Sequence, residues 1–242
     1  MNLYKYASPS AFYPLAGKMI PWFAITAAIL FAISLYVGFI VAPARAGEQN
    51  QVYHIIFIHV AAAWMGMFLY VLMAIYAGVG WAFNARLASM MASSLSITGA
   101  LFTLISLITG SLWGKPTWGT WWAWDARITS TLILLFLYIG FISLQSAIDD
   151  PRRADRAGAV LALVGVINVP IIYFSVQWWN TLHQGATIRL IAKPQMTGSM
   201  LAAMFIMLGA CWLYSIAVVL IRLRCIILER EQSAAWVAEG AA

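Results

Sequence analysis

The chain has 242 residues, of which 63% are hydrophobic and only 9% are charged; its mean hydropathy is +0.85 and its net charge is +6. A soluble domain carries about 25% charged residues, so this composition leaves too little polar surface for a water-soluble globule and predicts an integral membrane protein. The apolar runs are long and continuous, which excludes a barrel whose strands alternate over about ten residues, and the basic residues are scattered among loops, which excludes a nucleic-acid-binding face.

Six apolar stretches are long enough to cross a membrane as helices, since a bilayer core needs about 20 apolar residues per helix. They are residues 20–41, 55–78, 93–112, 128–148, 158–179 and 200–221. The predicted fold class is therefore an all-α integral membrane protein, a six-transmembrane-helix bundle that forms a single membrane domain over residues 1–242. The VAPARAG segment after the first stretch looks like a signal cleavage site, but the apolar run before it exceeds the 7–15 residues of a signal peptide. We expect that run to be retained as the first helix.

The distribution of basic residues predicts the orientation. With both termini inside, the inner segments contain nine Lys and Arg residues and the outer loops contain five. Short cytoplasmic loops carry the excess of Lys and Arg, and the turn DDPRRADR before the fifth stretch is the clearest inner anchor. We therefore expect both termini to be cytoplasmic and three loops, residues 43–54, 113–127 and 180–197, to lie outside.

The second outer loop is part of the segment WGKPTWGTWWAWDARITS, residues 113–130. This segment contains five of the twelve tryptophans. An aromatic belt at the membrane interface would distribute such rings over many helix ends. Five rings of about 150–250 Å² each instead approach the largest apolar patch that a protein normally exposes, about 300–600 Å². The segment is interpreted as a platform for a large, flat, apolar ligand such as haem, a quinone or a lipid, with a dense aromatic belt as the alternative.

Local spacing predicts how this platform is built. Gly114, Pro116 and Gly119 are expected to break regular structure early in the segment. The residues after them have the i, i+3, i+4, i+7 spacing of one helix face: Trp118, Trp121, Trp122 and Asp125. This spacing predicts a short amphipathic helix that lies in the plane of the outer interface.

All three histidines are predicted to lie on the outer side. His54 and His59 begin the second stretch, and His183 follows the fifth. Histidine nitrogen is a common axial ligand of haem iron, and two histidines could hold the iron from opposite faces; each could equally be an amphipathic residue at a helix end. A catalytic metal held by three histidines stays open, whereas a structural zinc site is disfavoured because it needs four ligands. Cys211 and Cys225 lie far from the histidines and are expected to be apolar fillers.

Charged and polar residues near the outer loops are assigned supporting roles. Haem propionates would need cationic partners, and the outer cations that could supply them are Lys115, Arg127, Arg189 and Lys193. Asp125 is expected to cap the start of the fourth helix, where a negative charge is favourable. Pro170 is expected to kink the fifth helix, and Asn168 is expected to donate a hydrogen bond to another helix.

The tryptophan segment, together with IIFIHV, WWNTLHQG and LLFLYIG, resembles the tryptophan-rich (WWD) haem-handling proteins of bacterial cytochrome c maturation, and most closely the haem exporter protein C family. The resemblance implies a multi-pass protein of the bacterial inner (cytoplasmic) membrane with a periplasmic functional face, and not an enzyme. It implies transient binding of haem b, with His59 and His183 as axial ligands of the iron. The remaining residues of the implied haem site are Trp113, Trp118, Trp121, Trp122, Trp124, Lys115, Asp125 and Arg127.

The resemblance also implies partners. Haem would be delivered to a membrane-anchored periplasmic haem chaperone. The protein would work with a two-component ABC transporter (ATPase and permease) and a small single-helix subunit. It would also contact membrane lipid, and no nucleic-acid partner is expected. His54 departs from the family, whose members carry arginine there. From the residues alone, three alternatives stay open: a membrane haem protein that transfers electrons from a quinol, a transporter permease, and a structural subunit of an ABC assembly.

Overall fold

The computed structural model describes residues 7–42, 52–183 and 196–240. In these ranges six segments are long and apolar enough to cross a membrane, so the predicted all-α bundle of six spanning helices is confirmed. The helices are α1 (Pro9–Tyr36), α2 (Ile55–Phe83), α3 (Arg86–Trp118), α4 (Ala126–Ala147), α5 (Pro151–Gly165), α6 (Asn168–Trp178), α7 (Gly198–Arg230) and α8 (Ala235–Gly240). A π-helical turn, η2 (Val37–Val41), extends α1, and a 3-10 turn, η3 (Val52–His54), leads into α2. Most of these helices continue past the apolar stretches predicted from the sequence, because the turns that flank the hydrocarbon core remain helical.

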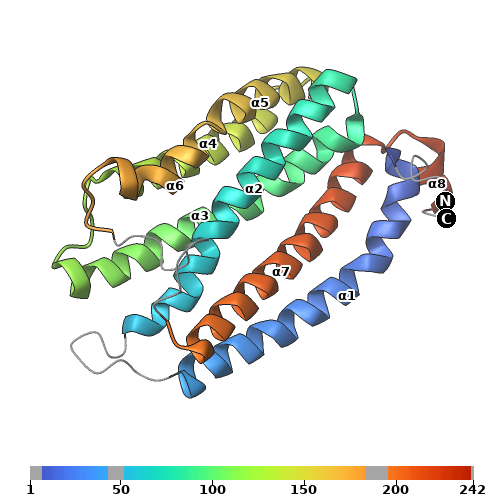
Figure 1. Cartoon of the computed structure of the whole chain (residues 1–242). Coiled ribbons are helices and arrows are strands. Elements are labelled where there is room, and N and C mark those ends of the chain that lie inside the picture. The colour runs from blue at the N-terminus through green and yellow to red at the C-terminus, as the bar shows by residue number, and fades with distance from the viewer. Residues whose placement is uncertain (1–6, 43–51, 184–195, 241–242) are drawn as a thin grey trace.

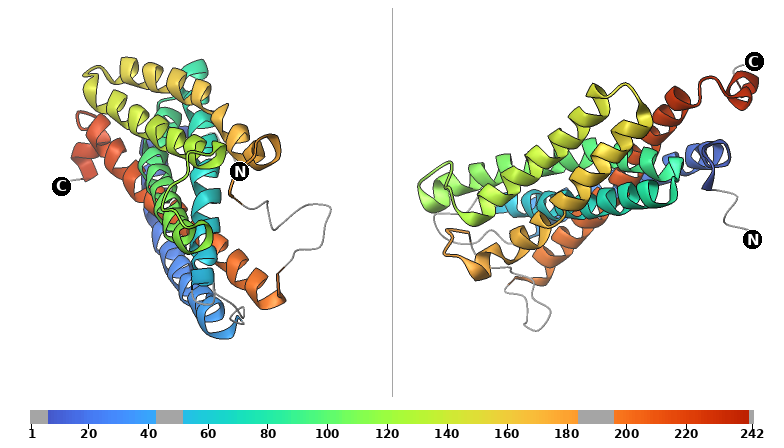
Figure 2. Two further views of the ribbon diagram at one scale, coloured as in Figure 1. Left: turned by 90° about the vertical axis from the view of Figure 1, so that its left-hand side faces the viewer. Right: turned by 90° about the horizontal axis from the view of Figure 1, so that it is seen from above.

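The α2–α3 hairpin is the centre of the bundle. On one side α7 packs against both helices of the hairpin and α1 packs against α7; on the other side α4 and α5 pack against α3 and α2. Figure 1 shows that α1 begins and α8 ends at the same end of the bundle, while the α3–α4 connection lies at the opposite end. Figure 2 shows how α4, α5 and α6 form a layer beside the other helices.

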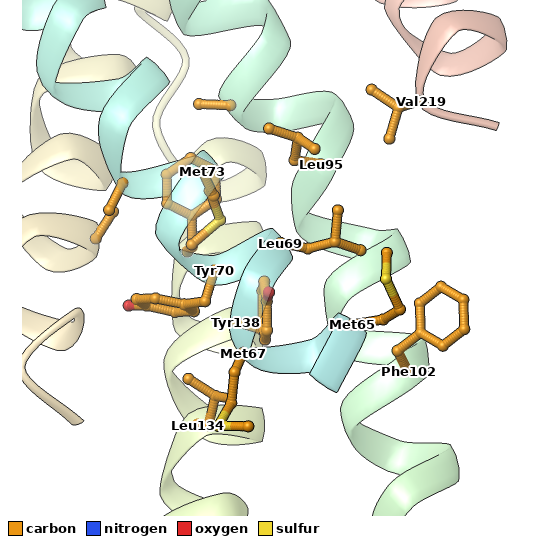
Figure 3. Packing of buried hydrophobic residues seen from close by; sticks show 14 of the residues in the cluster. Met65, Met67, Leu69, Tyr70, Met73, Leu95, Phe102, Leu134, Tyr138 and Val219 are labelled. Carbon is orange, nitrogen blue, oxygen red and sulfur yellow. The ribbon is translucent and has the colours of Figure 1, made fainter. Parts of the chain in front are cut away.

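The core combines large methionine and aromatic side chains with alanines and aliphatic residues, and Figure 3 shows the packing around Tyr70, Met73 and Tyr138. The hydroxyl of Tyr138 donates a hydrogen bond of 2.8 Å to the carbonyl of Gly66. A Cβ atom on Gly99 would collide with the same tyrosine ring and hydroxyl. Small residues permit close approach of helices in a membrane, and Gly99 thereby lets α4 place an aromatic ring between α2 and α3.

The fifth spanning segment, for which a kink at Pro170 was predicted, is interrupted just before that residue. The helix stops at Gly165 and resumes at Asn168, because Pro170 has no N–H group to donate to the carbonyl four residues earlier. The predicted interhelical role of Asn168 is also confirmed, since its side-chain amide donates a hydrogen bond of 2.8 Å to the carbonyl of Ser130 in α4. The half-helix α6 is therefore connected to α4 independently of α5.

Candidate ligand-binding site

The tryptophan segment begins as the last turns of α3. The prediction that Gly114 and Pro116 break the structure is wrong, since α3 continues to Trp118. Pro116 stands in the last turn of the helix, where its missing N–H costs a single intrahelical hydrogen bond. The helix ends at Gly119, whose φ of 78° lies in the left-handed region that glycine tolerates.

The residues that follow, 119–125, form an irregular segment that leads into α4, so the predicted short interfacial helix is wrong. Two side chains hold the backbone out of a helix. Ser111 donates a hydrogen bond of 2.7 Å to the carbonyl of Trp121, and the Thr120 hydroxyl bonds both the N–H and the carbonyl of Trp122. Hydrogen bonds from side chains to the backbone, such as those of Thr120, compete with helix formation. Asp125 accepts a hydrogen bond of 2.9 Å from the N–H of Ile128 and caps α4, as predicted.

A cavity of about 50 Å³ lies beneath this segment, between α2, α3, α4 and α6. Its wall brings together seven of the residues predicted for the site: His59, Trp113, Trp118, Trp121, Trp122, Arg127 and His183. The volume has room for roughly four water molecules and is far below the 300–1,000 Å³ or so of pockets that enclose ligands of drug size. A ligand as large as a macrocycle therefore requires the walls to separate.

Two histidine rings form part of the wall. The centroids of His59 and His183 are 6.3 Å apart and the ring planes differ by 33°. Two imidazoles that bind one metal ion from opposite sides, with bonds of about 2.0–2.1 Å, have centroids roughly 6.3 Å apart. Among the residues that the structure describes, no group of three His, Cys, Asp or Glu side chains could hold a metal ion. The pair therefore suits an ion whose other ligands come from the bound molecule, and not a three-histidine catalytic metal.

Thr109 determines which nitrogen of His59 is available. The Nδ1 atom of His59 lies 3.0 Å from the Thr109 hydroxyl, and that hydroxyl donates its own hydrogen to the carbonyl of Ile105 at 2.6 Å. Because the hydroxyl proton is used, the oxygen accepts a hydrogen bond from Nδ1–H. This assigns the Nδ1–H tautomer to His59 and leaves the Nε2 lone pair for a ligand. A hydrogen bond to the second nitrogen is the usual support of a metal-binding histidine.

Aromatic rings enclose the two histidines. Trp113 is 8% exposed and meets His59 edge-on, with centroids 5.8 Å apart. The ring of Trp118 lies 6.0 Å from that of His183. A Cβ atom on Gly110 would stand 3.0 Å from the His59 ring, so glycine at this position gives the imidazole its space.

Several buried polar atoms of the site have no partner among the residues that the structure describes. They include the indole N–H groups of Trp113 and Trp122 and one carboxylate oxygen of Asp125. Buried donors of this kind are rare in native proteins. The half-buried Arg127 lines the cavity as well and forms no salt bridge within the described part of the chain. Two unpaired indole donors and a guanidinium make this wall suitable for a ligand that carries carboxylates.

Other predicted residues lie away from the cavity. Trp124 is 76% exposed and contacts Trp122 edge-on. Lys115 donates a hydrogen bond of 3.2 Å to the carbonyl of Gly119 and lies 6.0 Å from the Trp121 ring centroid. The ring of His54 stacks on Phe39 at 5.1 Å and is not part of the wall. Arg189 and Lys193 lie outside the described residues.

The sequence interpretation missed the contribution of α3. Thr103, Ser106, Thr109 and Gly110 all line the cavity or support His59. A signal was present, because Thr109 and Gly110 stand one turn before the tryptophan segment. Small and hydroxyl-bearing residues in a membrane helix are more often explained by helix packing. A role in supporting a ligand-binding histidine therefore cannot be recognised from these residue types alone.

Comparison with known proteins identifies relatives over nearly the whole chain. The family model described as heme exporter protein C matches residues 2–238. The chain is similar to the heme exporter protein C of Escherichia coli K12, with 44% identity over 98% of this chain and 96% of that protein, and to that of Paracoccus denitrificans, with 33% identity over the full length of both. A ccmC-like mitochondrial protein of cytochrome c biosynthesis from Marchantia polymorpha is 43% identical over 66% of this chain and 67% of that protein.

Proposed function

The chain belongs to the heme exporter protein C family, and we propose that it binds haem b in the cavity beneath residues 119–125, with His59 and His183 as the axial ligands of the iron. Its role is in the handling of haem for cytochrome c maturation. Haem is the cargo here, so binding is transient and the site must release what it holds.

The spacing of His59 and His183 is the observation that carries this proposal. Haem supplies four equatorial nitrogens, so the protein needs to contribute only two axial ligands from opposite faces. The pair of rings 6.3 Å apart fits this requirement, and the surrounding tryptophans offer flat apolar surfaces to the macrocycle. Arg127 and the two unpaired indole N–H groups would meet the propionates.

Haem entry requires one wall of the cavity to move, and α6 is the wall best suited to do so. It is an 11-residue half-helix separated from α5, and its start is tied to α4 through Asn168. His183 follows its end. A swing of α6 would separate His183 from His59 without disturbing the α2–α3 hairpin.

We further propose that the cavity faces the periplasm and that the chain lies in the inner membrane. The excess of Lys and Arg in the opposite segments supports this orientation. Trp121, which is 55% exposed, and Trp124 form an apolar rim, from which haem would pass to the membrane-anchored periplasmic chaperone. The two-component ABC transporter and a small single-helix subunit are the proposed membrane partners. A protein that takes electrons from a quinol is not favoured, since His183 lies in a loop and not deep in a helix.

The test is a quantitative haem assay with visible spectra on the detergent-purified protein, co-expressed with the transporter and chaperone. Wild-type protein should carry low-spin haem, and His59→Ala and His183→Ala should each lose it or change its spectrum. His54→Ala is the matched control and should keep the haem, because His54 does not line the cavity. Wild-type haem content in both variants, or no haem in the wild type, would overturn the proposal.

A further inference from the structure

A second cationic feature lies at the other end of the bundle, where α7 ends beside the start of α1. The guanidinium of Arg224 lies 4.2 Å from the centroid of the Tyr13 ring. It also rests against Gly17, where a Cβ atom would stand 3.1 Å from the guanidinium carbon. The ring below and the glycine beside it hold the charged group in a defined position between the two helices.

Among the residues that the structure describes, this guanidinium has no acidic partner. The two salt bridges at this end of the described structure join Arg86 to Glu231 and Arg230 to Asp155, and neither uses Arg224. The Nε atom of Arg224 is buried and has no hydrogen-bond partner among the described residues. A guanidinium that stacks on an aromatic face keeps its N–H edge available for a planar bidentate anion such as phosphate.

The adjacent face of α1 suits a lipid. Lys18, which follows Gly17, is exposed, and the exposed residues at i+4, i+7 and i+11 from it are Trp22 (76%), Ile25 (59%) and Ile29 (54%). This face therefore has a cation, then a tryptophan one turn deeper, then a continuous apolar stripe. Tryptophan marks the level of the headgroups in membrane helices, so Lys18 and Arg224 lie at that level and the stripe lies in the hydrocarbon.

We propose that Arg224 and Lys18 bind the phosphate of an anionic phospholipid whose acyl chains lie along the Trp22–Ile25–Ile29 face of α1. The charge complementarity is specific to an anionic headgroup, and basic sites between membrane helices are known to hold such lipids. The apolar stripe distinguishes a phospholipid from a free phosphate ion, which would gain nothing from it. The site is at the opposite end from the haem cavity and does not depend on the function proposed for that cavity.

The experiment measures the thermal unfolding midpoint, Tm, of the delipidated full-length protein in neutral detergent. Phosphatidylglycerol, phosphatidylcholine with the same acyl chains, and inorganic phosphate are added separately. A ligand at about a hundredfold excess over its Kd should raise the Tm of a protein of this size by about 5 °C or more. We expect phosphatidylglycerol to do so for the wild type, and the other two additions to have no effect.

Arg224→Gln should lose most of the phosphatidylglycerol shift. Lys18→Gln should lose part of it, and this exposed position keeps the test valid if Arg224→Gln does not fold. Arg156→Gln removes the same charge from an exposed position on α5 and should keep the full shift. The proposal is wrong if Arg156→Gln loses as much of the shift as Lys18→Gln and Arg224→Gln, which would indicate diffuse attraction, or if phosphatidylcholine or inorganic phosphate stabilises the wild type equally well.

Discussion

The imidazole rings of His59 and His183 lie 6.3 Å apart across one cavity, although His59 belongs to α2 and His183 follows α6. Two local features allow this meeting. The fifth spanning segment is interrupted before Asn168, and the hydrogen bond from Asn168 to Ser130 connects α6 to α4. The site is therefore assembled from separate elements, and its properties depend on residues that do not contact the ligand.

Thr109 provides the first test of such support. Thr109→Val keeps the size of the side chain but removes the acceptor for Nδ1–H of His59, so the tautomer that exposes Nε2 is no longer favoured. Loss of this kind of support costs about 10–100-fold in metal affinity. We expect weaker haem binding and a shifted visible spectrum in a titration with haem, with rescue by Thr109→Ser. Thr131→Val is the control, since Thr131 also lines the cavity but its hydroxyl donates a hydrogen bond to the Arg127 carbonyl of its own helix and not to a histidine among the described residues.

The tryptophans should divide into two groups. Trp118 lines the cavity, and its replacement by alanine removes on the order of 100 Å² of contact with haem, or about 2 kcal/mol, which is roughly a 30-fold loss of affinity. Trp124 is 76% exposed outside the wall, so Trp124→Ala should leave affinity nearly unchanged. Equilibrium haem titration by fluorescence quenching measures both variants. Equal losses in the two would show that the rings act together as an interfacial belt.

Arg127 should recognise a propionate. Arg127→Gln removes a charge-assisted hydrogen bond, and haem affinity should fall roughly tenfold or more. Lys115→Gln should have little effect, because Lys115 bonds the Gly119 carbonyl and does not line the cavity. Haem dimethyl ester, whose propionates are neutral, separates charge recognition from damage to the fold. If Arg127→Gln weakens binding of the ester as much as binding of haem, Arg127 does not act through a propionate.

Packing in the core should depend on Gly99. Gly99→Ala forces Tyr138 away from its place between α2 and α3, and overpacking of a core typically costs about 1–3 kcal/mol. We expect Tm to fall by about 5 °C in a thermal unfolding experiment. Gly198→Ala is the matched control: it adds the same methyl group at the start of α7, where no atom lies within 4 Å, and Tm should be unchanged or slightly raised.

Features that depend on neighbours along the chain were predictable from the sequence. The six spanning helices follow from the length of the apolar stretches, the interruption of the fifth follows from Pro170, and the cap of α4 follows from Asp125. The sequence also indicated that His59, His183 and the tryptophans would gather on one side of the membrane, because the predicted topology places each of them at the outer end of a spanning stretch.

Only the tertiary structure decided which of these side chains face one another. Trp118, Trp121 and Trp122 have the spacing of a helix face, yet the Ser111 hydroxyl donates a hydrogen bond to the carbonyl of Trp121 and residues 119–125 are irregular. That bond joins residues ten positions apart, and no periodicity encodes it. The same reason applies to Arg127 inside the cavity, Lys115 outside it and Thr109 beneath His59. The direction of a side chain at a helix end depends on contacts with other helices, whereas sequence patterns report the helix alone.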